Sequence, residues 1–136
     1  MKLYKSLKGL ILEGVNRVDI EKAIKGRNIV NIYYSGDMTL NPGYRNIEPV
    51  CDGMSNTKVG SGNLVVRAWQ IDGATDRPET MPGWRLFRAD KITHWQSTLD
   101  TFDEPRPNFN PVGDKTLKNN ACFVIADFKT APETIV

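Results

Sequence analysis

The chain has 136 residues, of which 40% are hydrophobic and 25% charged, so a disordered polymer is excluded and one folded domain with its own core is expected. The net charge is +2, which excludes a histone-like polycation and means that any basic surface must arise from the arrangement of residues. The longest apolar run, Ala121 to Ala126, has six residues, far fewer than the roughly 20 that span a membrane.

Two helices are predicted ahead of the first strand. An apolar stripe at helical spacing predicts a helix over residues 3–13. A second helix is predicted from Asp19 to Lys25, with Asp19 as its N-cap and Gly26 at its end. Residues 1–30 hold seven Lys and Arg against three acidic residues, so these helices carry most of the positive excess.

From Asn28 onward the pattern changes to short strands separated by turns. Segments rich in β-branched and aromatic residues predict strands over residues 28–34, 44–50, 63–71, 84–88 and 92–96, with loops over 52–62 and 72–83. Three prolines predict that residues 101–113 run extended over the surface, and a last strand is predicted over 121–128. Five short strands after helix, with no alternating helices between them, predict a mainly β (α+β) fold built as a small barrel.

Signatures of catalysis and metal binding are nearly absent. His94 is the only histidine, and it is either a residue that contacts a ligand or an ordinary solvent-facing one. Cys51 and Cys122 lie in apolar segments and are interpreted as small, buried, reduced residues of a protein in the reducing cytosol. The glycine-rich segment 53–62 lacks the Gly-Lys-Ser/Thr ending of a phosphate loop, and the carboxylates are scattered. We therefore expect no enzyme, no metal and no cofactor.

Arginines in the predicted strands are the more informative residues. Arg67, Arg85 and Arg88 lie where an unpaired charge is costly to bury, and their planar forks suit phosphate groups. Trp69 follows Arg67 by two residues and shares its face, which suggests a platform for a phosphate backbone and stacked bases. In the alternative interpretation these arginines pair with acidic side chains and the tryptophans fill the core; the candidate acids are Glu48, Asp72 and Asp90.

Four segments in order resemble the WYL domain family. They are a helix ending in Ala23-Ile24 with Arg27 after it, an Arg-x-Ile-x-Pro strand over residues 45–49, a hydrophobic strand over 63–69, and Arg-x-Phe-Arg-x-Asp-Lys-Ile over 85–92. The triplet that names the family would fall at Gly62-Asn63-Leu64, where only the leucine matches. The resemblance implies an Sm-like, SH3-type five-stranded barrel that senses a ligand, in a cytoplasmic protein of a bacterial or phage-infected cell.

With this resemblance, the expected organisation is an N-terminal helical segment (1–18), a barrel (19–100) and a C-terminal extension (101–136). About 26 residues precede the first strand, too few for the helix-turn-helix domain that such regulators carry. We expect a non-enzymatic module that binds single-stranded nucleic acid or a nucleotide. The candidate contacts are Arg45, Arg67, Arg85, Arg88, Lys91, Trp69 and His94.

The alternative function is a protein-interaction or assembly module that docks on a regulator or enzyme, since Sm-like barrels associate edge to edge. A homodimer or higher oligomer is compatible with either function. A nucleotide-processing enzyme would need a general base, and the sequence points to none.

Overall fold

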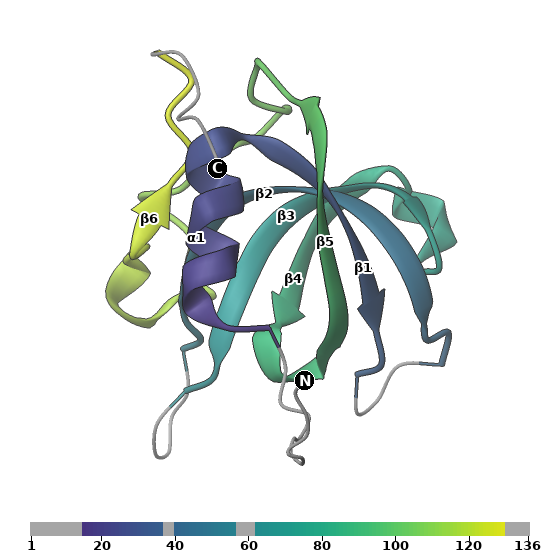
Figure 1. The fold of residues 1–136 in the computed structure, drawn as a ribbon. Helices are drawn as coiled ribbons and strands as arrows, with labels where there is room; N and C mark the ends of the chain where they lie inside the picture. Colours follow the sequence, from purple (N-terminus) through teal and green to yellow (C-terminus); the bar gives the residue numbers. More distant parts are fainter. Residues whose placement is uncertain (1–14, 37–39, 57–61, 130–136) are drawn as a thin grey trace, which may run out of the picture.

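One antiparallel sheet of six strands and a single α-helix form the structured part of the chain in the computed structural model, which describes residues 15–36, 40–56 and 62–129 (Figure 1). The helix predicted over residues 3–13 lies outside the described residues. The helix α1 is Arg17–Gly26, and the strands are β1 (Asn28–Tyr34), β2 (Gly43–Met54), β3 (Leu64–Gly73), β4 (Gly83–Arg88), β5 (Ile92–Thr101) and β6 (Val124–Ile125). Three short 3-10 turns complete the elements: η1 (Pro78–Thr80), η2 (Ala89–Lys91) and η3 (Lys118–Asn120).

The sheet has the strand order β4-β3-β2-β1-β5, and β6 pairs with β2 outside this path. The predicted mainly β class and the five consecutive strands are confirmed. Closure into a barrel is not shown, because β4 and β5 stand at opposite ends of the order and no backbone pairing joins them within the described ranges. The sheet is strongly curved, with α1 lying against β2 and β6 (Figure 1).

Helix α1 begins and ends at different residues from those predicted. Asn16 is the N-cap, and its side chain accepts a hydrogen bond from the backbone N–H of Asp19 at 2.9 Å. Arg27, not Gly26, takes the left-handed conformation that ends the helix, with φ of 50°. The buried Arg27 guanidinium donates to the carbonyl of Asp127, a contact from the far end of the chain that helix-capping patterns do not contain.

Two strands are longer than predicted and one is shorter. β2 continues through Cys51 to Met54, because these residues pair with β3 on one side and β6 on the other. The predicted loop over 52–62 therefore begins too early. β5 continues to Thr101, whereas the strand predicted over 121–128 is reduced to Val124–Ile125. The pairing of β2 with β3 shifts register between Pro49, which has no N–H to donate, and Cys51.

The hydrophobic core has two clusters, and strand and helix residues contribute to both. The first includes Val30, Ile47 and Phe87. The second lies between the sheet, α1 and residues 102–129, which we name the extension. Gly53 permits this approach, because a Cβ at this position would lie 2.8 Å from the carbonyl oxygen of Ala121. Of the helices described, none is long and apolar enough to cross a membrane.

Candidate ligand-binding site

The outward face of β3 and β4 brings the predicted Arg67 and Trp69 together with a second tryptophan. Trp69 is the cross-strand partner of Trp84, and their rings meet edge to face with centroids 5.4 Å apart. Arg85 lies on the opposite, buried face of β4, as the alternation along a strand requires. The outward face therefore carries two guanidinium groups, of Arg67 and Arg88, and the two indoles.

The extension covers these tryptophans. Trp84 donates from Nε1 to the carbonyl of Pro107 at 2.7 Å. The guanidinium of Arg106 lies 5.5 Å from the centre of the Trp69 ring and forms two hydrogen bonds, of 3.0 and 2.8 Å, with the carboxylate of Glu48. Glu48 thus pairs with an arginine of the extension and not with a strand arginine, and the tryptophans are not an open platform for successive bases.

Arg67 is held by the extension through a bidentate ion pair. Its Nε and Nη2 donate to the carboxylate of Asp114 at 2.8 and 3.2 Å, and Nη2 also donates to Thr116 Oγ1 at 2.7 Å. Burial alone would raise the pKa of Asp114, but the hydrogen bonds from Arg67 and Thr116 outweigh it and hold the pKa below its usual value. Asp114 therefore occupies Arg67 as an anion near neutral pH.

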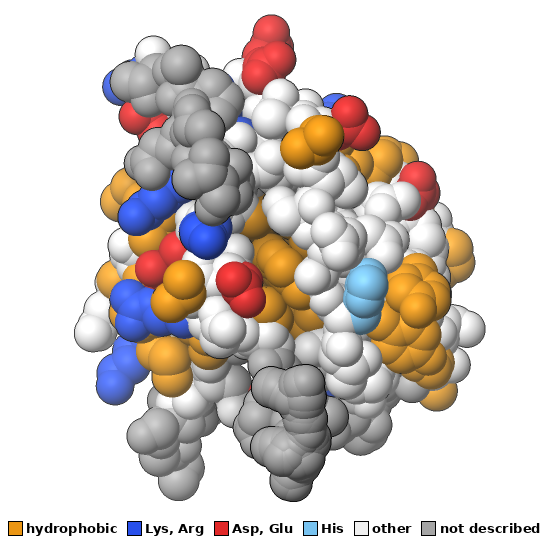
Figure 2. All heavy atoms as spheres, in the orientation of Figure 1, with side chains coloured by type: hydrophobic (Ala, Val, Ile, Leu, Met, Phe, Trp, Pro, Cys, Tyr) orange, Lys and Arg blue, Asp and Glu red, His pale blue; other side chains and the backbone are white. Residues whose placement is uncertain are grey.

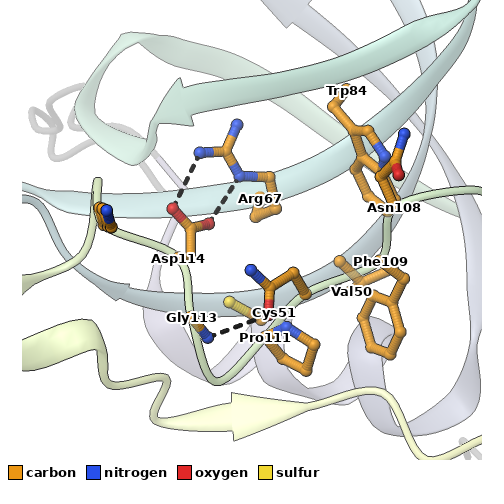
Figure 3. Close-up of a pocket in the computed structure, with 11 residues that line it drawn as sticks. Val50, Cys51, Arg67, Trp84, Asn108, Phe109, Pro111, Gly113 and Asp114 are labelled. Carbon is orange, nitrogen blue, oxygen red and sulfur yellow. Dashed lines mark hydrogen bonds and ion pairs between the residues drawn. The ribbon is translucent and has the colours of Figure 1, made fainter.

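A cavity of about 260 Å³ opens between this part of the sheet and the extension (Figure 3). The sheet contributes Arg67 and Trp84 to the lining, and the extension contributes Asn108 and Asp114, of which Asp114 is paired with Arg67 (Figure 3). Its volume is near the lower end, roughly 300 Å³, of the range for small-molecule sites. The complete lining is Val50, Cys51, Arg67, Trp84, Asn108, Phe109, Asn110, Pro111, Gly113, Asp114 and Lys115.

Arg45 and Arg85 point into the interior instead. Arg85 is 6% exposed, and its guanidinium donates to the carbonyls of Trp84, Arg77 and Thr80 and to the hydroxyl of Thr75. Arg45 is 5% exposed and donates to the carbonyl of Asn41 at 2.8 Å. Burial lowers the pKa of both side chains. These two arginines hold the loops around residues 41 and 75–80 against the sheet.

Arg88 and Lys91 lie beyond the cavity, at the β4 end of the sheet. Arg88 donates to the carboxylate of Asp90 from Nε at 3.1 Å and from Nη2 at 2.8 Å, which is one of the pairs named by the alternative interpretation. Lys91 belongs to η2, and its backbone carbonyl accepts hydrogen bonds from Ser35. Neither residue lines the cavity that contains Arg67.

His94 lies on an exposed aromatic row away from the cavity. It is opposite Tyr33 in the sheet, and Tyr33 is opposite Tyr44 on the next strand. The rings of Tyr44 and His94 are 5.7 Å apart, edge to face. Figure 2 shows the histidine beside a hydrophobic patch, while Lys and Arg side chains gather over α1 on the other side of this view. His94 therefore does not line the cavity that contains Arg67.

Three features of the site region are not apparent in the sequence. Asp114 and Asn108 come from a proline-rich segment without periodicity, and no pattern relates them to Arg67. The carboxylates of Glu21 and Asp52 face one another beneath α1, although they are scattered in the sequence. Cys51 and Cys122, far apart in the chain, meet at the extension. Among the described residues, no cluster of His, Cys, Asp and Glu could hold a metal ion.

Comparison with known proteins supports the fold alone. No protein-family model matches the chain, and no curated protein sequence matches it. Among solved structures, the fold is similar to part of proteasome accessory factor B/C (PafBC) of Arthrobacter aurescens, with a TM-score of 0.52 and 18% sequence identity. The match covers 73% of this chain and 14% of that chain, so this chain spans a small part of the length of PafBC.

The pair between Arg106 and Glu48 gives a test of how the extension is held. In Arg106→Ala, the Glu48 carboxylate, which is 3% exposed, loses its cation, and we expect the free energy of unfolding to fall by about 2 kcal/mol. Urea unfolding at constant pH measures this loss. Adding Glu48→Gln to the same chain removes the unpaired charge and should restore part of the stability. A loss below about 0.5 kcal/mol, as for an ordinary surface pair, would contradict this role.

Proposed function

We propose that the chain is a non-enzymatic, ligand-sensing module of the WYL type, which binds a nucleotide or the end of a single-stranded nucleic acid in the cavity between the sheet and the extension. The observation that carries the proposal is the cavity itself, where Arg67 and Trp84 of the sheet meet Asn108 and Lys115 of the extension. A guanidinium fork suits a phosphate, indole suits a base, and amides can pair with base edges.

The WYL assignment is supported by the four sequence segments and by the fold. The Arg-x-Ile-x-Pro segment lies within β2, and the segment with Phe87 spans β4 and η2. The strand order fits an Sm-like sheet, and the similarity of fold to part of PafBC agrees with it. We propose that this sheet is the ligand-binding unit and that the extension is its sensing element.

Sensing would occur by exchange of anions at Arg67. With no ligand bound, Asp114 holds the guanidinium fork. A phosphate that takes the same fork displaces the carboxylate, because two anions cannot share it without repulsion. Thr116 contacts both Arg67 and Asp114, so the displacement would reach the extension. Ligand binding would thereby change how the extension lies on the sheet.

Of the seven predicted contacts, we propose Arg67 as the principal one, with Trp84 and Lys115 added from the cavity. Arg88 and Lys91 could meet a second phosphate of a longer strand that leaves the cavity. Arg45 and Arg85 are engaged inside the fold and would act by positioning loops. With about two phosphates neutralised, the log–log dependence of affinity on salt should have a slope of roughly −1.5, whereas four phosphates would give roughly −3.

Binding can be measured by titrating nucleoside monophosphates and short random oligonucleotides while following tryptophan fluorescence, since Trp84 lines the cavity. We expect Arg67→Ala to weaken binding at least tenfold and Asp114→Asn to strengthen it several-fold, because the amide no longer competes as an anion. Arg77→Ala, which removes an exposed arginine outside the cavity, is the matched control.

Opposite effects of Arg67→Ala and Asp114→Asn would support the exchange of anions. Equal affinity of the wild type and Arg67→Ala would contradict the site. A salt slope near zero would contradict recognition of phosphate.

A second candidate function, docking on a protein or on another copy of the chain, is favoured by the outer strand β5. It is the last strand in the sheet order, and its Leu99 is 99% exposed. Unpaired strand edges with apolar side chains readily pair with another strand. Light scattering of the wild type and of Leu99→Lys separates the two functions: an oligomer that dissociates on substitution favours docking, and a monomer in both favours ligand binding.

A further inference from the structure

Two cysteines to which the proposed function gives no role meet where the extension contacts the sheet, and one of them, Cys51, lines the cavity. Cys51 belongs to β2 and Cys122 to the extension, 71 positions later in the sequence. Their Sγ atoms are 2.6 Å apart, and both thiols are free. The carbonyl oxygen of Pro111, 3.3 Å from Cys122 Sγ, is an alternative acceptor for its single S–H, so Cys122 has a polar neighbour on each side.

Backbone hydrogen bonds hold this meeting point in register. On one side, the N–H of Phe123 donates to the carbonyl of Asp52, and on the other, the N–H of Ala126 donates to the carbonyl of Val50, each at 2.7 Å. Gly53 leaves room for the extension, since a side chain there would collide with the carbonyl of Ala121. The contact between the two sulfurs is thus part of how the extension docks on β2.

The two thiols differ in access and in acidity. Cys51 is buried on its strand but lines the cavity beside Pro111 (Figure 3), while Cys122 is half-buried. The hydrogen bond between the thiols, together with burial, raises the pKa of Cys51. The same hydrogen bond lowers the pKa of Cys122, so Cys122 is the better nucleophile of the pair.

The geometry points to an oxidative modification site: a peroxide converts Cys51 and Cys122 into a disulfide that fixes the extension to β2. The proposal does not rest on the proposed function, because no step involves the ligand. It differs from the sequence interpretation, which treats the two cysteines as separate buried residues.

The reaction balances in two steps. The Cys122 thiolate attacks hydrogen peroxide, the O–O bond breaks, and the products are a sulfenic acid on Cys122 and hydroxide. Cys51 then attacks the sulfenic sulfur, the S–S bond forms, and the oxygen leaves as water with a proton from Cys51. The two sulfurs together lose two electrons, which the peroxide takes up.

Such a disulfide would raise the stability of the whole domain. The ring that it closes contains β3, β4 and β5, and a cross-link over so long a loop restricts the unfolded chain strongly. The strand of the extension that pairs with β2 has only two residues, so the disulfide would supply the covalent attachment that this short pairing lacks. We expect oxidation to raise Tm by about 10 °C and to slow proteolysis within residues 102–123.

The test uses the full chain, first reduced with dithiothreitol and then treated with a small molar excess of hydrogen peroxide. Intact mass after maleimide labelling counts the free thiols, peptide mapping identifies the bond, and thermal unfolding with and without dithiothreitol gives the shift in Tm. We expect loss of two hydrogen atoms, no labelling by maleimide, a Cys51–Cys122 peptide and the rise in Tm, all reversed by dithiothreitol.

Cys122→Ser is the matched control, because this half-buried position tolerates a small polar side chain, and Cys51→Ala removes the other partner. Neither variant should form the bond or gain stability with peroxide. Three outcomes would overturn the proposal: both thiols stay reactive to maleimide after peroxide, the bond forms between two chains instead of within one, or the bond forms and changes neither Tm nor proteolysis.

Discussion

Replacing Arg85 with alanine is expected to lower the free energy of unfolding by about 3 kcal/mol, and Tm by roughly 10 °C, in a chain that still folds. The guanidinium is almost fully buried and donates four hydrogen bonds, three of them to backbone carbonyls, which hold the loop around η1 against β4. Without it, those acceptors lose their partner and the interior gains a void. Urea unfolding at pH 7 gives the loss directly.

Two controls separate this structural role from a general effect of charge. Arg77→Ala removes an exposed arginine from the same loop and should change stability by less than about 0.5 kcal/mol. Arg85→Lys keeps the charge but cannot reproduce the planar fork, so it should lose an intermediate amount. If Arg85→Ala is as stable as Arg77→Ala, the buried guanidinium does not hold the loop, and Arg85 becomes a candidate for ligand contact again.

Asp52→Asn is expected to raise the free energy of unfolding by about 3 kcal/mol at pH 8 and to leave it nearly unchanged at pH 4. Burial beneath α1, and then the neighbouring Glu21 carboxylate, raise the pKa of Asp52 to about 8. No described residue donates a hydrogen bond to its Oδ2. A proton on this oxygen can be shared with Glu21, and the amide of asparagine can donate in the same direction while Oδ1 still accepts from Val124.

The sign of the pH dependence follows from the direction of the shift. Because the pKa of Asp52 is higher in the folded chain than in the unfolded chain, the folded chain holds more protons between about pH 4 and pH 8. The stabilisation that protonated Asp52 contributes to the folded chain is therefore fully present below pH 4 and is lost as the pH rises toward 8. Glu21, whose pKa is lowered by its hydrogen bond with Asp52 and by Arg17, opposes part of this loss.

Urea unfolding at pH 4, 6 and 8 measures the slope for the wild type and for Asp52→Asn. Arg17→Gln is a matched control, since Arg17 approaches the same carboxylate at 4.0 Å from the exposed surface, and its loss should steepen the slope. Parallel curves for the wild type and Asp52→Asn would show that Asp52 is ionised in the folded chain throughout this range.

The strands were largely predictable because their signals are local. β1 was predicted with its observed bounds, since Asn28–Tyr34 is rich in β-branched and aromatic residues and has turn residues after it. The ends of β2 and β5 were not predictable in the same way. Asp52-Gly53 has the composition of a turn, but pairing with β3 and β6 extends the strand through it. The length of β2 thus depends on β6, whose Val124 contacts Asp52 from 72 positions away in the sequence.

The candidate site was predictable only in its types of residue. Alternation along β3 placed Arg67 and Trp69 on one face, as observed, but it did not separate them from Arg85, which was expected to contact the ligand and lies on the buried face of β4. It could not reveal which face the extension covers, or that Asp114 would hold Arg67. The pairing of Arg88 with Asp90, two residues apart, was within reach of the sequence.

By itself, the sequence determined the mainly β class, the succession of five strands along the chain and the shared face of Arg67 and Trp69, because hydrophobic period and turn chemistry act over a few neighbouring residues. The tertiary structure alone decided that the extension covers the tryptophans, that Glu21 faces Asp52 and that Cys51 meets Cys122. These contacts join segments that are distant in the chain, and their formation depends on burial and backbone pairing across the whole sheet, which no local pattern encodes.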